Sequence, residues 1–330
     1  MNQRRVAVVT GGSAGVGRAV CVELAQHGWD VAVLARGQAG LAGVLSDIEQ
    51  AGARGLVIGT DVADLAQVRA AAEETEKDLG PIQLWVNVAF AGALRYFWDT
   101  PDAVFRRITD VTYLGQVNGT RVALEYMRPR DSGVIVQVGS ALAFRGIPLQ
   151  SAYCGAKHAI IGFTESVITE LKHDNSAVKV CMVQLPAVNT VQFDWNDSDF
   201  EQHPMPVAPI FQPELPARAV RYLADHPRRN MWVGASTAAT ILGNRLAPWL
   251  LDWYLGKSGV KGQLTTKAGP RYGSNVFEPK DEHHDRGAHG MFDDQAHTRD
   301  PWSAASMNRR SLVLSATAAA ALATVWVRRR

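Results

Sequence analysis

The chain has 330 residues, of which 47% are hydrophobic and 20% are charged, a composition typical of one globular α/β domain with an appended segment. The formal net charge of +2 gives no electrostatic support for a nucleic-acid partner. Three widely spaced cysteines in apolar surroundings are typical of buried free thiols in a reducing compartment, and they are Cys21, Cys154 and Cys181.

The amino-terminal pattern predicts a strand, a glycine-rich turn and a helix. Residues 5–9 form an unbroken apolar run, as in a parallel strand buried on both faces. Because this run begins so early, we expect no signal peptide and a cytoplasmic location. The turn TGGSAGVG then leads into a helical pattern, so backbone amides and the positive end of the helix dipole can meet a phosphate. The expected dinucleotide contacts in this turn are Gly11, Ser13, Ala14, Gly15, Val16 and Gly17.

The second predicted strand, residues 30–35, bears on the choice of dinucleotide. In dinucleotide-binding folds an acid at the end of this strand binds the ribose 2′-hydroxyl, whereas a nearby arginine accommodates a 2′-phosphate. Ala35 stands where the acid is expected, and Arg36 follows it. This pattern favours NADP(H) over NAD(H), and the alternative is that Arg36 is a solvated loop residue.

The rest of the first 235 residues alternates between helices and strands. We expect strands over residues 55–59, 82–88, 134–138, 178–184 and 230–233. We expect helices over residues 41–51, from about 64, from 101 to 127 with Thr100 as N-cap, over 152–173 and over 216–225. Asp61 is an adenine contact, part of the start of the next helix, or both. The alternation predicts a Rossmann-like doubly wound parallel sheet of about seven strands with helices on both faces.

Three side chains near the middle of the chain form a candidate catalytic set. Tyr153 and Lys157 are four residues apart in a predicted helix, so they project from one face. An ammonium close to a phenol favours its ionised form, which makes Tyr153 a candidate general acid/base. Ser140 ends a predicted strand, and side chains at that position face the ligand crevice of open α/β sheets. The alternative for a tyrosine and a lysine at this spacing is an ordinary helix surface.

In combination, these motifs resemble those of the short-chain dehydrogenase/reductase family over residues 4–234. The turn from Thr10 to Gly17 resembles the family's T-G-x-x-x-G-x-G, and Ser140 precedes Y-x-x-x-K at the family's usual spacing. Residues 186–190 resemble the P-G-x-x-T segment near the nicotinamide. The resemblance implies further cofactor contacts from Asp61, Val62, Asn87, Ala89, Tyr153, Lys157, Pro186, Val188 and Thr190.

Three segments depart from the family pattern. The family's N-N-A-G is N-V-A-F at residues 87–90, so that only Asn87 and Ala89 carry over. Thr112 stands where the family has a catalytic asparagine, and a hydroxyl there could still hold a water of the proton relay to Lys157. Ala187 replaces a glycine, which restricts the backbone of that turn.

The resemblance implies an NADP(H)-dependent oxidoreductase acting on a carbonyl/alcohol pair. In the family's scheme Tyr153 moves the proton, Ser140 holds the substrate oxygen, Lys157 also holds the ribose, and Thr112 is the fourth candidate. The family resemblance also suggests a homo-dimer or tetramer. A second hypothesis is a catalytically weak dinucleotide-binding protein with a regulatory or scaffolding role.

Aromatic residues in the predicted loops suggest a bulky apolar substrate. Residues 188–213 are irregular, proline-rich and aromatic, as is typical of a lid. The rings expected around the crevice are Phe90, Phe97, Trp98, Phe144, Phe193 and Trp195, and the few charges near them are Arg95, Asp99, Arg145 and Asp194. The alternative is that the rings pack the lid and leave a small polar pocket.

Beyond the catalytic domain, predicted for residues 1–235, the chain changes character. We expect an amphipathic cover or oligomer contact over 236–256, a flexible polar linker over 257–308 and an apolar helix over 309–330. The uncharged stretch 311–327 is either a membrane anchor or a soluble or dimer-packing helix. No metal is expected, because the spacing of the histidines matches no closed site; they are His283, His284, His289 and His297.

Overall fold

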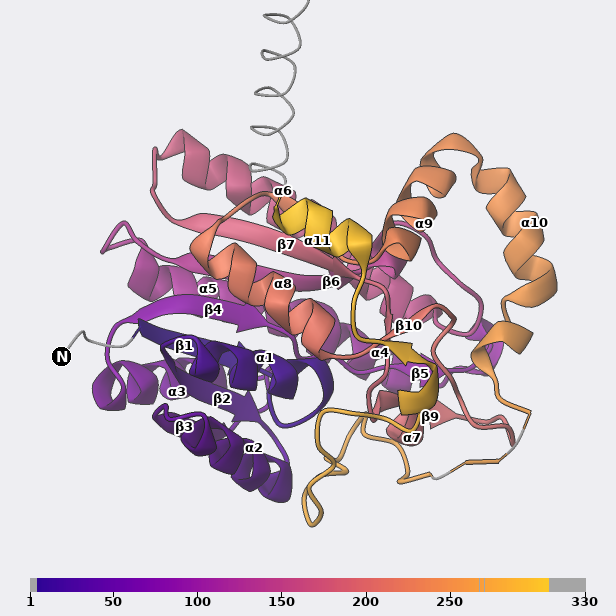
Figure 1. Cartoon of the computed structure of the whole chain (residues 1–330), viewed down its shortest axis with the longest axis horizontal. Coiled ribbons are helices and arrows are strands. Elements are labelled where there is room, and N and C mark those ends of the chain that lie inside the picture. Colours follow the sequence, from indigo (N-terminus) through magenta and orange to yellow (C-terminus); the bar gives the residue numbers. More distant parts are fainter. Residues whose placement is uncertain (1–4, 267, 270, 309–330) are drawn as a thin grey trace, which may run out of the picture.

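A computed structural model describes residues 5–266, 268–269 and 271–308. Within these residues, one sheet contains the strands β1 (Arg5–Thr10), β2 (Trp29–Ala35), β3 (Gly55–Gly59), β4 (Ile82–Asn87), β6 (Val134–Ser140), β7 (Lys179–Leu185) and β11 (Asn230–Trp232). The strands are all parallel and follow the order β11-β7-β6-β4-β1-β2-β3 (Figure 1). The predicted Rossmann-like fold is confirmed, and each strand ends within two residues of its predicted bounds.

Helices cover both faces of the sheet. Those of the sheet domain are α1 (Gly15–Gln26), α2 (Gln38–Gln50), α3 (Leu65–Asp78), α4 (Asp102–Thr109), α5 (Gly115–Met127), α6 (Ser151–His173) and α8 (Glu214–Asp225). Side chains of α1, α2 and α8 share one apolar cluster with Ala7 and Val9 of β1. Side chains of α3, α4, α5 and α6 share the other with Val6 and Val8. Successive residues of β1 are thus buried on opposite faces, which explains its unbroken apolar sequence.

The helix pair α4–α5 begins differently from the prediction. Asp64 caps α3 by accepting hydrogen bonds from two backbone amides, but Thr100 does not cap α4. The N-cap is Pro101, and the Thr100 hydroxyl instead donates to the Tyr96 carbonyl at 2.9 Å. The prediction of Thr100 as N-cap is therefore wrong: α4 begins one residue later, and the Thr100 side chain turns back to the preceding short helical turn. A π-helical turn, Asp110–Leu114, joins α4 to α5.

Loops at the carboxyl edge of the sheet are held by small secondary elements. The predicted lid contains α7 (Gln192–Trp195), and its β9 (Asp197–Ser198) pairs with β5 (Ala93–Leu94). A second small sheet joins β8 (Ala187–Val188), β10 (Ile210–Phe211) and β12 (Ala296–His297). The carboxy-terminal part of the described chain is thereby joined to the lid.

The segment predicted as an amphipathic cover forms two helices. They are α9 (Ala235–Leu246) and α10 (Pro248–Ser258), which stand beside the carboxyl edge of the sheet (Figure 1). Among the described residues of α10, Trp249 is 70% exposed and Trp253 is 57% exposed. The last described helix, α11 (Pro301–Met307), contacts α8, α9 and β11.

Between α10 and α11 the chain returns to the sheet domain (Figure 1). Residues 275–287, which we term the strap, have little regular secondary structure but contact the beginnings of α1 and α2. The Gly15 amide donates to the Gly287 carbonyl at 3.1 Å, and the Gly40 amide donates to the Asp281 carbonyl at 3.0 Å. The sequence predicted a flexible polar linker here, whereas the structure places the strap against the sheet domain.

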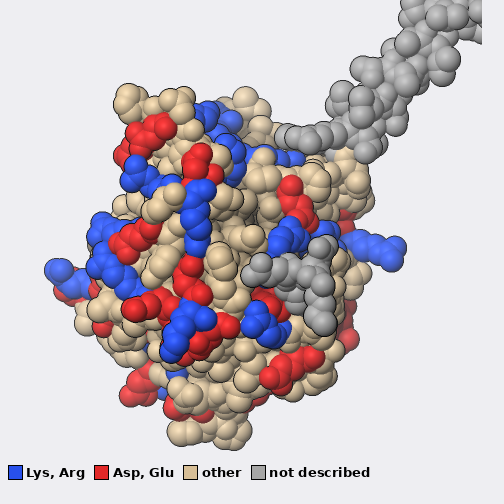
Figure 2. Space-filling view, turned by 90° about the vertical axis from the view of Figure 1, so that its left-hand side faces the viewer, with Lys and Arg blue, Asp and Glu red and all other residues tan. Residues whose placement is uncertain are grey.

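Surface charge and the apolar carboxy-terminal stretch are the features that concern nucleic-acid and membrane partners. On the face shown in Figure 2, basic and acidic side chains are interspersed. The apolar stretch 311–327, the candidate membrane anchor, lies outside the described residues. Of the helices that are described, none has the length and apolar character needed to cross a membrane.

Candidate active site

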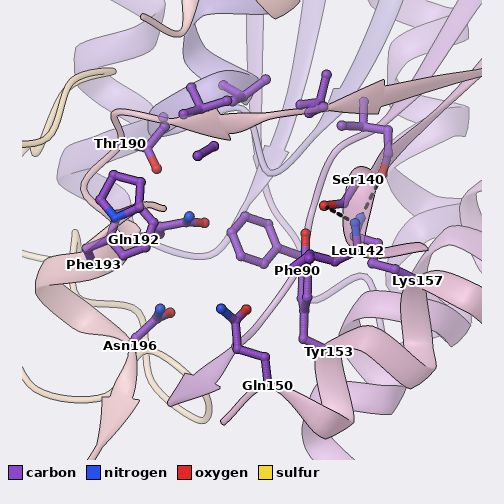
Figure 3. A pocket seen from close by; sticks show the side chains of 18 of the residues that line it. Phe90, Ser140, Leu142, Gln150, Tyr153, Lys157, Thr190, Gln192, Phe193 and Asn196 are labelled. Atoms are coloured by element: carbon purple, nitrogen blue, oxygen red, sulfur yellow. Dashed lines mark hydrogen bonds between the residues drawn. The ribbon is translucent and has the colours of Figure 1, made fainter. Parts of the chain in front are cut away.

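Ser140, Tyr153 and Lys157 lie together at the carboxyl edge of the sheet (Figure 3). Ser140 is the last residue of β6, and the other two residues are one turn apart near the start of α6. The Lys157 ammonium lies 5.6 Å from the centre of the Tyr153 ring and donates to the Val138 carbonyl at 2.7 Å. The Ser140 hydroxyl accepts a hydrogen bond from the Leu142 amide at 3.1 Å. The three predicted side chains therefore face one cavity.

Burial changes the proton affinity of both ionisable groups. Removal from water raises the pKa of the Tyr153 phenol, and a hydrogen bond with Ser140 opposes part of this rise. Burial lowers the pKa of Lys157 to about 7, because its side chain is only 2% exposed. Tyr153 is thus a neutral phenol at physiological pH. In this state the arrangement is suited to giving a proton to an oxygen.

The glycine-rich turn forms a close backbone cradle. Gly11 has a φ of +67°, and a Cβ added to Gly17 would lie 2.1 Å from the Gly11 carbonyl oxygen. Ala14, the N-cap of α1, has no side-chain cap within the described structure. The Gly15 amide donates to the Gly287 carbonyl, but the positive end of the α1 dipole still faces the turn, and the absence of side chains lets a dinucleotide approach. The turn fits the phosphates of a dinucleotide.

Gly17→Ala is expected to weaken dinucleotide binding at least about tenfold and to lower the free energy of unfolding by about 1–3 kcal/mol, because the new methyl group overlaps backbone. Isothermal titration and urea denaturation measure the two effects. Gly162→Ala is the matched control, since Gly162 is also helical and an added Cβ would meet nothing within 4 Å. Equal behaviour of the two variants would contradict the assignment of the turn.

A cavity of about 570 Å³ joins the glycine-rich turn to the candidate catalytic side chains. It is lined by most of the residues predicted to bind the cofactor, namely Gly11, Ser13, Ala14, Gly15, Val16, Gly17, Arg36, Asp61, Val62, Ala89, Tyr153, Lys157, Pro186, Val188 and Thr190. Two predicted site residues, Asn87 and Thr112, are fully buried and do not line it.

Asn87 and Thr112 hold the backbone around the cavity. The Asn87 amide nitrogen donates to Gln137 at 2.9 Å, and its oxygen accepts from the Trp85 indole at 2.9 Å. The Thr112 hydroxyl accepts from the Ala91 amide and donates to the Ala91 carbonyl, both at 3.0 Å. Since its proton and one of its two acceptor positions are used by the Ala91 backbone, Thr112 supports the loop after β4.

The substrate side of the cavity contains half of the predicted rings. Phe90, Phe193 and Trp195 line it, and the Phe90 ring meets Tyr153 edge to face with centres 5.7 Å apart. The other three do not line it: Phe97 and Trp98 are 65% and 76% exposed, and Phe144 lies outside the lining. Phe97 and Trp98 follow a strand that ends beside the cavity, as predicted, but the short helical turn Phe97–Asp99 directs their side chains to solvent.

Other lining residues were not predicted. Apolar groups come from the lid and from α10, and they include Met205, Val207, Leu251, Tyr254 and Leu255. Three amide side chains also line the cavity: Gln150 lies beside Tyr153, and Gln192 and Asn196 lie across from it in the lid (Figure 3). The apolar pattern of α10 was visible in the sequence, but its position over the cavity depends on tertiary packing.

Three charged residues expected near the pocket are paired with other protein groups. Arg95 pairs with Asp197 and Asp199, and Arg145 pairs with Asp252 at 2.5 Å. Asp194 contacts the fully buried His203 at 2.9 Å. Of these three residues only Arg145 lines the cavity, and its charge is paired, so the pocket wall is more apolar than the neighbouring sequence suggests.

Arg36 lines the other end of the cavity, but its guanidinium has backbone partners. Its terminal nitrogens donate to the carbonyls of Asn275 at 2.5 Å and Phe277 at 3.0 Å in the strap. Burial lowers the pKa of Arg36, as does the neighbouring Arg107, whereas Asp61 and Asp281 raise it. The strap also adds Pro279, Lys280 and Asp281 to the lining, and the sequence pattern gave no sign of this.

In the described parts of the chain, no group of three or more His, Cys, Asp or Glu side chains could hold a metal ion. The three cysteines are buried and free. Burial raises the pKa of the Cys154 thiol to about 11, so that this neighbour of Tyr153 stays protonated at neutral pH.

Comparisons with known proteins agree with this geometry. Residues 5–200 match the family model for short chain dehydrogenase. The chain is similar to "Uncharacterized oxidoreductase YxnA" of Bacillus subtilis (strain 168), with 29% identity over 286 residues, or 86% of this chain and 80% of the relative. It is 32% identical over 178 residues to 3-dehydrosphinganine reductase of Danio rerio, a match that spans 52% of this chain and about half of that relative (54%).

The fold also matches a solved structure. A short chain dehydrogenase/reductase from Burkholderia phymatum, solved in complex with NAD, superposes with a TM-score of 0.66 at 22% identity. The match covers 78% of this chain and 98% of that protein.

Proposed function

The chain belongs to the short-chain dehydrogenase/reductase family, and on this premise we propose that it interconverts a carbonyl compound and an alcohol using a nicotinamide dinucleotide, with Tyr153 as general acid/base. The observation that carries the proposal is the shared cavity. Ser140, Tyr153 and Lys157 line the same continuous space as the glycine-rich turn. A hydride donor bound along that turn would lie within one cavity with a proton donor.

Some lining residues would bind the dinucleotide, and others would transfer the proton. A bound nicotinamide dinucleotide supplies or accepts the hydride. The turn from Gly11 to Gly17 binds its phosphates, while Pro186, Val188 and Thr190 form the wall beyond the turn. Since Thr190 packs against Gly15, these two segments are suited to enclose the same ligand.

The catalytic side chains act on the substrate oxygen. Tyr153 gives it a proton during reduction and takes the proton back during oxidation. The Ser140 hydroxyl accepts from the Leu142 amide and interacts with the Tyr153 phenol, and in the presence of substrate it would donate to the same oxygen and position it. The hydrogen bond of Lys157 to Val138 fixes its place behind the phenol, where it supplies positive charge in its protonated form, which, with its pKa lowered to about 7, is populated at and below neutral pH.

The sequence suggested NADP(H) on the strength of Arg36. That assignment needs N–H groups of Arg36 that can donate to a 2′-phosphate, and strap carbonyls already accept from Nη1 and Nη2, which leaves fewer of its five N–H donors for such a phosphate. The support for NADP(H) is weakened accordingly, and the proposal is a nicotinamide dinucleotide whose phosphorylation state depends on the strap.

We propose a bulky, mainly apolar substrate. Rings of Phe90, Phe193 and Trp195 and apolar side chains of α10 line the substrate side, and the charge of Arg145 there is paired with Asp252. The amides of Gln150, Gln192 and Asn196 can receive one polar substituent. A relative named for a reductase reaction, 3-dehydrosphinganine reductase, agrees with the reduction of a carbonyl group.

The test is the oxidation of NADH or NADPH by a panel of n-alkyl aldehydes. We expect kcat/KM to rise with chain length, since each buried methylene contributes about 0.8 kcal/mol, or about fourfold. Trp195→Ala should flatten the series, whereas Phe97→Ala, at an exposed ring, should leave it unchanged. A flat or falling series in the wild type would contradict an apolar substrate.

A regulatory dinucleotide-binding protein is the second hypothesis, and the joint presence of Ser140, Tyr153 and Lys157 in one cavity argues against it. It would be supported if the protein bound a dinucleotide but consumed none with any aldehyde or ketone of the panel.

A further inference from the structure

We propose that Asp281, in the strap, reads the adenosine ribose of the dinucleotide: its carboxylate accepts a hydrogen bond from the ribose 2′-hydroxyl and so favours NAD(H) over NADP(H). The inference rests on the proposed function, because it assumes that a nicotinamide dinucleotide occupies the cavity. It concerns a residue of the carboxy-terminal segment, beyond the residues 5–200 that match the family.

Asp281 is a buried acid, and one of its carboxylate oxygens has no hydrogen-bond donor in the described part of the chain. Its side chain lines the cavity, the residue is 5% exposed, and its Oδ2 has no hydrogen-bond partner among the described residues. A buried carboxylate oxygen in this state is costly, by about 1–3 kcal/mol or more, unless a ligand supplies a donor. The carboxylate of Asp281 therefore lacks a donor beside the cavity, and a ligand hydroxyl that reaches its cavity side would supply one.

The position of the carboxylate is determined by backbone on two sides. A Cβ added to Gly37 would lie 2.0 Å from Oδ1 of Asp281, and one added to Gly40 would lie 2.2 Å from Oδ2. The carboxylate thus occupies space left by two glycines at the beginning of α2. The Gly40 Cβ position is also 3.0 Å from the side chain of Ser13, which places Oδ2 beside the glycine-rich turn.

This is where a ribose-binding acid is needed. In dinucleotide folds that acid comes from the end of the second strand, and here Ala35 ends β2 and has no acidic group. Ala35, Ser13 and Asp281 line the same cavity. The strap therefore places a carboxylate near the end of β2, where β2 itself has none.

The same contacts leave little support for a 2′-phosphate. Amides in the first turn of α2 would suit such an anion, but those of Ala39 and Gly40 donate to strap carbonyls, and that of Gln38 donates to Glu282 at 3.1 Å. Arg36 donates to strap carbonyls, and Arg18 pairs with Asp47 and Asp285. A phosphate would also meet the charge of Asp281.

One cation favours the opposite outcome. Lys280 lines the cavity next to Asp281, and its ammonium pairs with the 79% exposed Glu278 at 3.2 Å. An exposed pair of this kind is weak, so Lys280 could be recruited by a 2′-phosphate. If the attraction of Lys280 outweighs the repulsion of Asp281, the protein will bind a dinucleotide with a 2′-phosphate more tightly than one without it.

The test measures the adenosine half of the ligand alone. Isothermal titration of the full chain with ADP-ribose and with 2′-phospho-ADP-ribose reports this end of the cavity without any turnover. We expect the wild type to bind ADP-ribose at least about tenfold more tightly, as one hydrogen bond to a charged group accounts for such a ratio. Asp281→Asn should weaken ADP-ribose about tenfold without weakening the phosphorylated probe.

Glu282→Gln is the matched control. It removes one negative charge from the neighbouring residue, outside the cavity lining, and its amide oxygen can still accept from Gln38. The ratio of the two affinities should stay as in the wild type. An equal change in both variants would show a general effect of charge and would overturn the role of Asp281.

Two further results would overturn the inference: a wild type that binds 2′-phospho-ADP-ribose as tightly as ADP-ribose or more tightly, or an unchanged ratio in Asp281→Asn. The first does not depend on the folding of any variant. Failure of the proposed function gives a different pattern, namely the expected binding ratios without turnover of either NADH or NADPH. Absence of binding by both probes would reject both proposals.

Discussion

Tyr153→Phe is expected to lower kcat at least about 1000-fold while the dissociation constant for the dinucleotide changes less than about twofold. The substitution removes only the phenolic hydroxyl and keeps the ring that meets Phe90 edge to face, so the packing beside the cavity is retained. Stopped-flow or steady-state assays give kcat, and titration of the protein without substrate gives the dissociation constant.

Tyr96→Phe is the control for loss of a tyrosine hydroxyl. Tyr96 stacks on Trp98 near the same edge of the sheet but does not line the cavity, so activity should be retained. A parallel loss of dinucleotide affinity in Tyr153→Phe would indicate a structural role for the phenol. An active Tyr153→Phe protein would require another proton donor, and Ser140 is the nearest hydroxyl for that test.

Lys157→Met should lower kcat by about 100-fold or more and should also remove a pH dependence of stability. Burial lowers the pKa of Lys157 to about 7, below its value of 10.5 in the unfolded chain. Between these two values the unfolded chain binds more protons than the folded one, so the free energy of unfolding rises with pH. From pH 7 to pH 8 the gain is about 1 kcal/mol, and the unfavourable contribution is fully present at lower pH.

Urea denaturation of the protein without dinucleotide, at pH 7 and pH 8, measures this gain as the difference between wild type and Lys157→Met. The three buried cysteines, whose raised pKa values oppose the trend at higher pH, are common to both proteins and cancel. Lys172→Met, at an exposed position of the same helix, should keep the wild-type pH dependence. Identical slopes in wild type and Lys157→Met would contradict the depressed pKa.

The sheet was predictable because its signals are local. Residues 6–9 are apolar without alternation, and each of them is buried on one face or the other of a two-sided sheet. The turn around Gly11 and Gly17 was predictable for a similar reason, since only glycine permits the backbone approach seen there. The spacing of Tyr153 and Lys157 sufficed to place both on one face of a helix.

Residues whose role depends on distant packing were less predictable. Asn87 belongs to a motif-like segment, yet its amide is used inside a polar network with Trp85 and Gln137. Phe97 and Trp98 share the composition of the true lining residues, and only the direction of a short helical turn separates them from the cavity. Arg36 had the expected sequence neighbours, but its partners come from a segment without periodicity.

The strap has a consequence for how the protein is made. Arg36 and Val276 are 240 positions apart, so a nascent chain can complete the sheet through β11 long before the adenosine end of the cavity is closed. Until the strap emerges from the ribosome, a dinucleotide would gain no contact with Asp281 and would stabilise the folded domain less. A premature stop codon between β11 and the strap is thus expected to yield a chain that retains all the strands of the sheet but is deficient in cofactor recognition.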